Sequence, residues 1–308
     1  MFGLIDLNKP AGFTSHDCVA KMRRLLNIRK IGHGGTLDPA ATGVLPIAVG
    51  KATRLLQFLP QDKAYRARIR LGVTTNTDDL EGEIINTASE VNLNYQQVAD
   101  SLQNFVGTIE QVPPMYSAIK RNGKKLYELA RKGETVEIPS RTVEIEKLEL
   151  LNYFPGDFPE IEVDINCSPG TYIRAIARDL GSILGVGGSL ANLIRTKSCG
   201  MQLDDSLTFE QLEEQLQNNR FKLIPPEQLL NHLKSIKLVK SDALCWCQGQ
   251  AINLSVENQS DREIFSTTSD YLVTYHEDNT FLGISVLIGD RTDFKLKPKV
   301  VCVKTPTA

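Results

Sequence analysis

Residues 32–43 read Gly-His-Gly-Gly-Thr-Leu-Asp-Pro-Ala-Ala-Thr-Gly. This loop of small residues carries one carboxylate, Asp38, close in sequence to the imidazole of His33. Pro39 disfavours the helical conformation for Asp38, and the glycines allow the backbone to bend and to lie close to a ligand. Asp-Pro and Gly-Gly are also ordinary turn dipeptides. The stretch is therefore the first candidate for a catalytic site, and a plain turn is the open alternative.

Length and composition limit the class of protein. The chain has 308 residues, enough for about two domains. Apolar residues make up 41% and charged residues 23%, which is typical of a globular protein and argues against a disordered one. No apolar run approaches the ~18 residues of a membrane span, and the N-terminus lacks the pattern of a signal peptide. We therefore expect a cytoplasmic protein that spans no membrane.

Six cysteines are spread along the chain. Only Cys245 and Cys247 are close together, and no second pair or suitably spaced histidine accompanies them. A structural zinc site needs four such ligands at characteristic spacings. The sequence therefore predicts reduced thiols and no metal, and it leaves the role of these two cysteines open.

Positive charge is local rather than general. The net charge of −2 gives no overall sign of a polyanionic partner. Residues 21–30 and 120–132 are nevertheless strongly basic, and the second segment also contains aromatic and glycine residues. Each segment fits either a nucleic-acid contact or the solvated face of a helix.

Hydrophobic periodicity predicts both strands and helices. Alternating apolar residues predict strands at 2–7, 65–71 and 161–167, and the second of these has a basic face of three arginines. Apolar residues at helical spacing predict helices that begin near residue 15, extend over 95–106 and begin near residue 173. The capping-box pattern of Thr208 and Gln211 predicts that another helix starts there. From about residue 241, short β-like runs at 271–275, 281–288 and 300–303 predict a small β-rich appendage.

The glycines invite a nucleotide-binding interpretation, which the spacing excludes. A P-loop needs four residues between its first glycine and its Gly-Lys pair, whereas Gly43 and Gly50 enclose six. Leu37 stands where the dinucleotide fingerprint requires its third glycine. A Gly-x-Ser-x-Gly elbow of a serine hydrolase is absent from the sequence.

Residues 32–47, GHGGTLDPAATGVLPI, resemble the catalytic motif of the TruB family of tRNA pseudouridine-55 synthases. Other segments resemble further motifs of this family: NKPAGFTS at 8–15, DKAY at 62–65, PPMYSA at 113–118, GKKLY at 123–127, GTYIR at 170–174 and LIRT at 193–196. The resemblance covers about residues 1–200 and, less sharply, the tail from 241 to 304.

The resemblance implies an α+β fold. A mixed, mainly antiparallel catalytic sheet flanked by helices is expected over residues 1–235, with an RNA-gripping insertion at about 111–141. A small C-terminal β-barrel of the PUA-like, RNA-binding type is expected over 241–308. The implied activity isomerises uridine 55 in the T-loop of tRNA to pseudouridine by base flipping, without a cofactor or metal, and assistance to tRNA folding is a second expectation. The expected partner is the T-arm of tRNA, and we expect a monomer with no protein partner.

The resemblance also implies three catalytic residues. In the reaction the N1–C1′ bond of uridine breaks, the base rotates, and C5 joins C1′. Asp38 is the expected nucleophile, attacking either C1′ or the pyrimidine ring, and the sequence does not distinguish these routes. Arg174 is expected to favour the charged form of this carboxylate. Tyr65 is expected to stack on the base and to accept the C5 proton.

Further residues are expected at the substrate. His33 is assigned to the flipped nucleotide, whose vacated space must be filled or held. Tyr172 is expected to pack beside the catalytic pair, and Lys9 to support the loop or to contact phosphate. The other implied contacts are Gly34, Leu193, Lys120, Lys124 and Lys125. A non-catalytic RNA-binding protein and a synthase that acts on another RNA are the alternatives.

Overall fold

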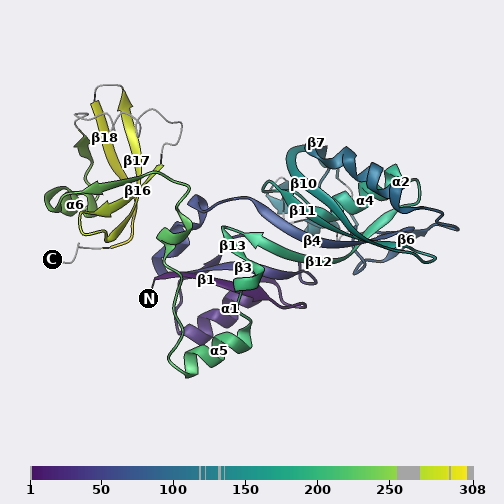
Figure 1. Ribbon diagram of the computed structural model, residues 1–308, viewed down its shortest axis with the longest axis horizontal. Helices are drawn as coiled ribbons and strands as arrows, with labels where there is room; N and C mark the ends of the chain where they lie inside the picture. The colour runs from purple at the N-terminus through teal and green to yellow at the C-terminus, as the bar shows by residue number, and fades with distance from the viewer. Residues whose placement is uncertain are drawn as a thin grey trace.

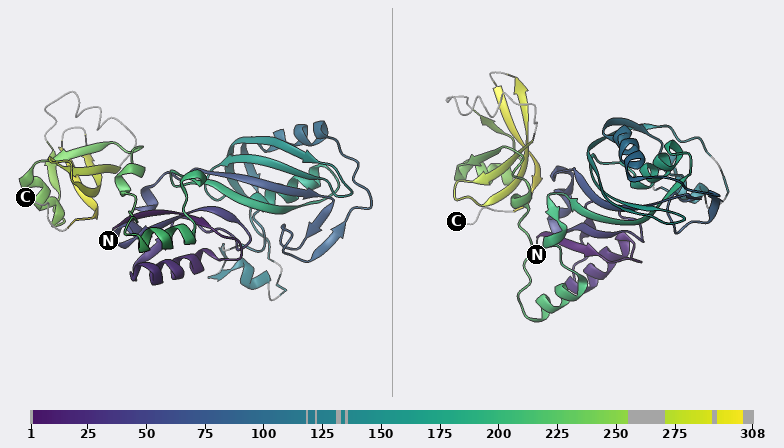
Figure 2. Two further views of the ribbon diagram at one scale, coloured as in Figure 1. Left: turned by 60° about the horizontal axis from the view of Figure 1, so that its bottom comes forward. Right: turned by 45° about the vertical axis from the view of Figure 1, so that its right-hand side comes forward.

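The structure, a computed structural model, describes residues 2–117, 119–121, 123–130, 133–134, 136–254, 271–290 and 293–303. Two units are visible within these residues (Figure 1). A nine-stranded sheet with helices on both of its halves forms the larger unit, and a five-stranded sheet forms the smaller unit at one end. Both additional views show the same separation (Figure 2).

The large sheet has the strand order β1-β3-β12-β4-β11-β10-β7, with β2 paired to β3 and β13 to β12. Its strands are β1 (Gly3–Lys9), β2 (Ile31–His33), β3 (Thr42–Val49), β4 (Lys63–Leu71), β7 (Gly107–Gln111), β10 (Arg141–Phe154), β11 (Glu160–Cys167), β12 (Gly188–Ser198) and β13 (Met201–Gln202). All of these pairs are antiparallel except that of β12 with β3. The mixed, mainly antiparallel α+β fold is therefore confirmed.

The parallel contact between β3 and β12 joins the two halves of the large sheet. It consists of two residue pairs, one of which is Gly43 with Arg195. A Cβ at Gly43 would lie 2.2 Å from the carbonyl oxygen of Arg195, and the backbone φ of Gly43 is +99°. Both the space and the conformation therefore require glycine at this position.

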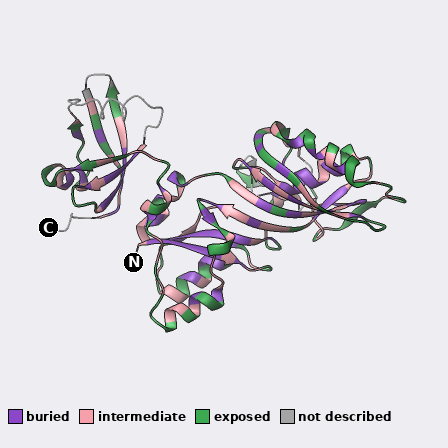
Figure 3. Cartoon of the chain, viewed as in Figure 1, coloured by how far each residue is buried: buried purple, intermediate pink, exposed green. Residues whose placement is uncertain are grey.

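Helices cover separate cores on the two halves of the sheet. On one half, α1 (Ser15–Leu26) and α5 (Phe209–Gln217) pack on β1 and β3; on the other, α2 (Tyr95–Leu102) and α4 (Ile173–Ile183) pack on β4, β10 and β11. Figure 3 shows the buried residues concentrated between these layers. No helix in the described part of the chain is long and apolar enough to cross a membrane. Shorter elements are α3 (Leu126–Ala130) and the 3₁₀ turns η1 (Gly50–Arg54), η2 (Leu56–Phe58), η3 (Gln103–Phe105), η4 (Leu203–Asp205) and η5 (Pro226–Leu229).

Local capping explains where three helices begin. Thr14 caps α1 and Thr208 caps α5, each in a reciprocal capping box with the third helical residue. Asn94 caps α2 in the same way, together with Gln97. The helix expected at 95–106 is shorter than predicted, because α2 ends at Leu102 and a 3₁₀ turn follows it.

Strand β4 alternates as its sequence predicts. Tyr65, Ala67, Ile69 and Leu71 are buried on one face. The arginines on the opposite face are paired with acids of β11: Arg66 Nε lies 2.9 Å from Asp164, and both Arg68 and Arg70 contact Glu160. Acidic partners therefore largely neutralise this basic face.

The small sheet has the order β14-β16-β17-β18-β15 and packs around α6 (Lys240–Cys247). Its strands are β14 (Ser235–Leu238), β15 (Ile252–Leu254), β16 (Tyr271–His276), β17 (Phe281–Asp290) and β18 (Asp293–Val301). Trp246 of α6 is fully buried and donates a hydrogen bond from Nε1 to Ser285 Oγ at 2.9 Å. Cys245 and Cys247 flank it as free, partly buried thiols, and the described residues contain no cluster able to hold a metal ion.

The two units pack against each other. The Phe2 and Phe281 rings stack with centroids 6.4 Å apart, and Phe58 meets Tyr271 edge-on at 5.0 Å. Lys51 Nζ also donates a hydrogen bond to the carbonyl oxygen of Cys302 at 2.8 Å. We propose a division into a catalytic unit and a C-terminal unit, and the pairing of β14 with β16 assigns residues 235–238 to the latter.

Two further hairpins lie in the large unit: β5 (Val73–Thr75) with β6 (Ile84–Thr87), and β8 (Lys120–Arg121) with β9 (Lys124–Lys125).

Asp6 is a buried carboxylate in β1 that accepts a hydrogen bond from Ser206 Oγ at 2.8 Å. Burial raises its pKa from 3.8 to about 6, because the charged form is poorly solvated there. Since the folded-state pKa lies above that of the unfolded chain, the ionised group destabilises the fold above about pH 6. This cost disappears as the pH falls toward 3.8.

We expect Asp6→Asn to stabilise the protein at pH 7.5 by about 1–3 kcal/mol, because it removes the buried charge. The gain should shrink as the pH is lowered from 6 toward 4. Urea unfolding across this pH range measures both effects. Asp164→Asn, at a half-exposed ion pair, is the matched control and should change stability little. A gain that does not depend on pH would contradict this account of Asp6.

Candidate active site

The loop that carries Asp38 connects β2 to β3 and is tied to the start of α1. Ser15 Oγ accepts a hydrogen bond from the Leu37 amide at 2.9 Å, and the Gly12 amide donates to the Pro39 carbonyl at 2.9 Å. These contacts are made on both sides of Asp38 along the backbone. The segment at 8–15 therefore fixes the conformation of the loop.

Lys9 provides the strongest of these ties. Its side chain is fully buried, and Nζ donates hydrogen bonds to the carbonyls of Pro10, Phe13 and Pro39 at 3.0, 2.6 and 3.0 Å. An ammonium group has three hydrogens, so all of them are used. Of the two roles expected for Lys9, this geometry matches support of the loop, and it leaves no hydrogen for a phosphate.

Arg195 supports the first half of the loop. This fully buried residue of β12 donates from Nε to the Val44 carbonyl at 2.7 Å and from its two Nη atoms to Thr36 and Gly35 at 3.3 and 3.1 Å. The guanidinium therefore holds the glycine-rich backbone from the sheet side. Sequence reasoning assigned Arg195 to a motif but gave it no role.

Asp38 and Arg174 are brought together. Arg174 Nη2 lies 3.0 Å from Asp38 Oδ2; the arginine side chain is 6% exposed and the aspartate side chain 45%. Arg174 is in the first turn of α4 and also donates to the Thr77 and Tyr116 carbonyls, at 3.1 and 3.0 Å. A buried cation held by neighbouring backbone groups thus orients a carboxylate that remains open to a ligand.

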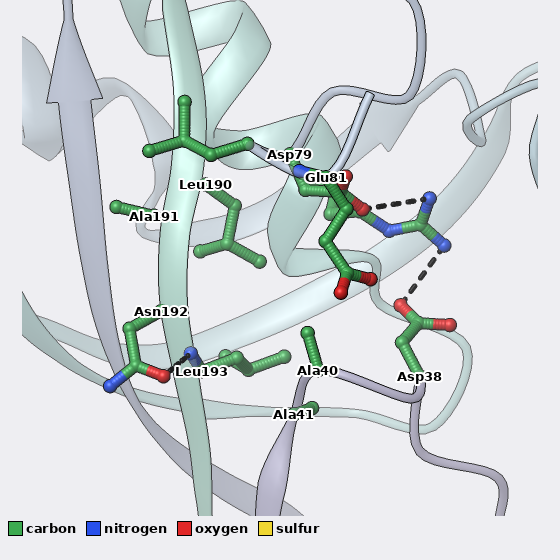
Figure 4. Close-up of a pocket in the computed structure, with 11 residues that line it drawn as sticks. Asp38, Ala40, Ala41, Asp79, Glu81, Leu190, Ala191, Asn192 and Leu193 are labelled. Carbon is green, nitrogen blue, oxygen red and sulfur yellow. Dashed lines mark hydrogen bonds and ion pairs between the residues drawn. The ribbon is translucent and has the colours of Figure 1, made fainter. Parts of the chain in front are cut away.

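A pocket opens directly beside this ion pair (Figure 4). Its cavity volume is about 150 Å³, and it is partly open to solvent. It is lined by Asp38, Ala40, Ala41, Asp79, Leu80, Glu81, Arg174, Leu190, Ala191, Asn192 and Leu193. The lining combines an apolar wall from β12 with polar groups around Asp38.

Two acids of this lining, Asp79 and Glu81, were missed by the sequence analysis. Asp79 Oδ2 lies 3.6 Å from Arg174 Nη1, and Figure 4 shows the Glu81 side chain pointing into the same space as Asp38. Arg178 holds their loop in place through an ion pair with Asp78 at 3.0 Å. The available signal was the acidic loop after β5 combined with the two arginines one helical turn apart on α4.

Tyr65 lies on the inner face of β4 and is only 7% exposed. It is not part of the pocket lining, and it belongs to the same buried cluster as Leu37 and Ala41 of the Asp38 loop. Burial raises the pKa of its phenol, the neighbouring Arg195 guanidinium opposes this rise, and the Asp38 carboxylate adds to it. Tyr65 is therefore close enough to both groups to be influenced by their charges.

His33 and Gly34 form the edge of the loop at the end of β2. His33 Nδ1 accepts a weak hydrogen bond from the Gly35 amide at 3.4 Å, and its ring meets that of His16 edge-on at 5.3 Å. Burial lowers the pKa of His33, and the charges of His16 and Arg195 lower it further. The Gly34 amide is bonded to the Pro46 carbonyl at 2.8 Å. Both residues lie on the loop that carries Asp38.

The other expected contacts are more dispersed. Leu193 lines the pocket, whereas Tyr172 caps α4 and exchanges two hydrogen bonds with the side-chain amide of Gln111. The Tyr172 ring lies under the Arg141 guanidinium at 4.5 Å. Lys124 is exposed on the β8–β9 hairpin; the side chains of Lys120 and Lys125 lie outside the described residues.

Comparison with known proteins identifies the family of this chain. Residues 23–173 match the model of the TruB family pseudouridylate synthase N-terminal domain, and residues 174–236 match that of the tRNA pseudouridylate synthase B C-terminal domain. The chain belongs to the TruB family. A relative from Gloeothece citriformis, named tRNA pseudouridine synthase B, is 56% identical over 98% of this chain and 97% of its own length. A relative of the same name from Trichormus variabilis is 55% identical over 93% and 95%.

Solved structures lead to the same family fold. A chain of a Cbf5-Nop10-Gar1 complex matches with a TM-score of 0.72 and 25% identity, covering 99% of this chain and 85% of its own. The resemblance drawn from the sequence motifs is thereby confirmed. The chain is a pseudouridine synthase, an isomerase, and the pocket beside Asp38 and Arg174 is its candidate active site.

We expect Lys9→Met to destabilise the protein by about 2–4 kcal/mol, because three buried carbonyl groups lose their shared donor. Lys21→Met is the matched control, since Lys21 is partly exposed and pairs with Glu213 at 3.0 Å. It should cost less than about 1 kcal/mol. Urea unfolding of both variants makes the comparison, and equal losses would show that Lys9 does not support the loop.

Proposed function

We propose that this protein converts uridine 55 in the T-loop of tRNA to pseudouridine, with Asp38 as the nucleophile acting on an extruded nucleotide. The observation that carries this proposal is the 3.0 Å ion pair of Asp38 with buried Arg174 at the mouth of a pocket. The relatives named tRNA pseudouridine synthase B, at 56% and 55% identity, support tRNA as the substrate class.

The chemistry is an isomerisation in which no atom or electron is gained or lost. The N1–C1′ bond of uridine breaks, the base turns within the site, and a C5–C1′ bond forms. The C5 proton then leaves, and N1 becomes protonated. A covalent adduct with the Asp38 carboxylate, on C1′ or on the ring, divides this change into two easier steps. We therefore propose that the protein needs no cofactor.

Arg174 and Tyr65 support Asp38 in this scheme. The Arg174 guanidinium is fixed by two backbone carbonyls, so it positions the carboxylate without reorganising during the reaction. Tyr65 lies next to the pocket, where its ring can pack on the base and its oxygen can receive the C5 proton. The phenol itself stays protonated at neutral pH, because burial raises its pKa. It would therefore accept the C5 proton only while passing its own proton on, and the protonation of N1 completes the balance.

The shape of the site supports base flipping. The reacting atoms of a stacked nucleotide are hidden, and the pocket beside Asp38 is a recess rather than a flat surface. We assign His33, on the same loop, to the space that the extruded base leaves. The exposed Lys124 hairpin and the C-terminal PUA-like sheet are proposed to hold the RNA backbone, in a monomer that acts on the T-arm in the cytoplasm.

We expect Asp38→Asn to abolish pseudouridine formation on an unmodified tRNA transcript, because an amide cannot replace the nucleophilic carboxylate. Carbodiimide mapping or mass spectrometry of the transcript, incubated without added cofactor, measures the product and its position. Affinity for the transcript should change less than about threefold. Asp62→Asn, at an exposed ion pair with Lys197, is the matched control. Full activity of Asp38→Asn would remove Asp38 from the chemistry, and product at another uridine would refute the T-loop assignment.

We expect Tyr65→Phe to bind tRNA normally and to form product at least about 100-fold more slowly, because the ring is kept and the proton-accepting oxygen is lost. Tyr65→Leu should lose both stacking and proton transfer. Single-turnover rates, together with binding measured by filter retention, separate the two effects. Equal rates for wild type and Tyr65→Phe would leave the ring with a packing role only.

A further inference from the structure

Lys63 is a lysine of the large unit that the mechanism above does not use. It begins β4 and lies two residues before Tyr65, so its side chain leaves the strand on the same inner face. The residue is partly buried. Within the described ranges of the chain its ammonium group has no hydrogen-bond or ion-pair partner. Partial burial of a charge without a partner carries a cost. Lys63 Nζ is not completely buried, so an anion from outside the chain can reach it.

A second cation lies beside Lys63 and increases this cost. A Cβ built on Gly35 would lie 3.6 Å from Lys63 Nζ and 3.7 Å from Arg195 Nη1, so both groups border the same backbone atom. Arg195 donates to three backbone carbonyls, which do not neutralise its charge. Burial and then the Arg195 charge lower the pKa of Lys63, and the smaller effects of the Cys199 and Cys167 thiols, rather than a carboxylate, oppose them. Positive charge is therefore left uncompensated beneath the Gly35 side of the loop.

Other buried or nearby lysines are satisfied. Lys9 donates to three carbonyls, Lys51 donates to the Cys302 carbonyl, and Lys197 pairs with Asp62 at 2.6 Å. Lys197 is a particularly close comparison, because it is paired with Ala64 across β12 and β4, next to the pair of Ser198 with Lys63. The fold thus supplies an acid to the neighbouring exposed lysine but not to Lys63. An anion from outside the chain would fill this role.

We propose that Lys63 binds a phosphate of the RNA backbone next to the extruded uridine and so positions that nucleotide over Asp38. The inference rests on the proposed function, which supplies the RNA. Gly35, which Lys63 borders, lies on the same loop as Asp38, so a phosphate held here is tethered close to the pocket. A lysine ammonium suits a phosphate as a compact point charge. Lys63 does not reach the reacting atoms and is a positioning residue.

Lys63→Met tests this role, because it keeps the apolar stem and removes the charge. The dissociation constant for a T-arm RNA is measured with the full-length protein at several salt concentrations. We expect binding to weaken about 10-fold or more and the slope of log Kd against log salt to fall by about 0.7–0.9, the contribution of one phosphate contact. Lys197→Met should leave the affinity within about threefold of wild type, since its charge is already paired.

Thermal unfolding without RNA gives a second readout. The substitution that weakens RNA binding should not lower the stability of the free protein. If Lys63 has no partner until an external anion binds, Lys63→Met should unfold at the same or a higher temperature than wild type, because an unpaired charge has been removed. A merely structural lysine would give a lower unfolding temperature together with an unchanged salt slope. That result would overturn the proposal, whatever the activity of the variant.

Neutral methylphosphonates placed 5′ or 3′ of the target uridine identify the phosphate. For wild type we expect one of the two substitutions to weaken binding about 10-fold, and for Lys63→Met the same substitution should have no further effect. Additive losses at both positions would overturn the proposal. Wild-type turnover of the unmodified RNA is measured in parallel: its failure would refute the proposed function, whereas the salt slope would still report on Lys63.

Discussion

Two buried cations that bind backbone carbonyls hold the Asp38 loop in place. Lys9 donates to Pro10, Phe13 and Pro39, and Arg195 donates to Gly35, Thr36 and Val44, so the loop is supported on both sides of Asp38. A loop of small residues has little side-chain packing of its own, and its conformational entropy must be offset by such contacts. Carbonyl groups carry no full charge. Unlike carboxylates, they therefore leave the positive charges of Lys9 and Arg195 uncancelled near Asp38.

Arg174 connects this loop to the other half of the sheet. It lies at the start of α4, contacts Asp38 on the loop and Asp79 on the hairpin segment, and donates to Tyr116 at the edge of the insertion. Three segments that are far apart in the chain thus meet on one guanidinium. Movement of any of them on RNA binding would be transmitted to the Asp38 carboxylate, because the arginine is buried and has few other conformations available.

The sequence was most informative where structure depends on neighbours in the chain. The Thr208 capping box, the alternation of β4 and the Asp-Pro loop are local patterns, and the structure contains all three. The pairing of Asp38 with Arg174 came from family motifs, since no periodicity relates residues on different elements. Lys63, Asp79 and Glu81 were overlooked for the same reason: their importance depends on which charges the fold places beside them. Arg66 is the opposite case: the sequence shows a basic strand face, but the fold neutralises it. The acids that do so lie on β11, and only the register of the sheet reveals them.

Charge is distributed unevenly across the site, and this asymmetry suits a nucleic-acid substrate. The pocket is lined by three carboxylates and one arginine, whereas Lys63 and Arg195 lie beside Gly35 of the same loop. A uracil base and its ribose are uncharged and can enter an acidic recess, but a phosphate would be repelled from it. The same phosphate would be attracted to the Gly35 side. The electrostatics therefore favour one orientation of the strand, with a phosphate on the Gly35 side and the nucleoside in the pocket, before any base-specific contact is made.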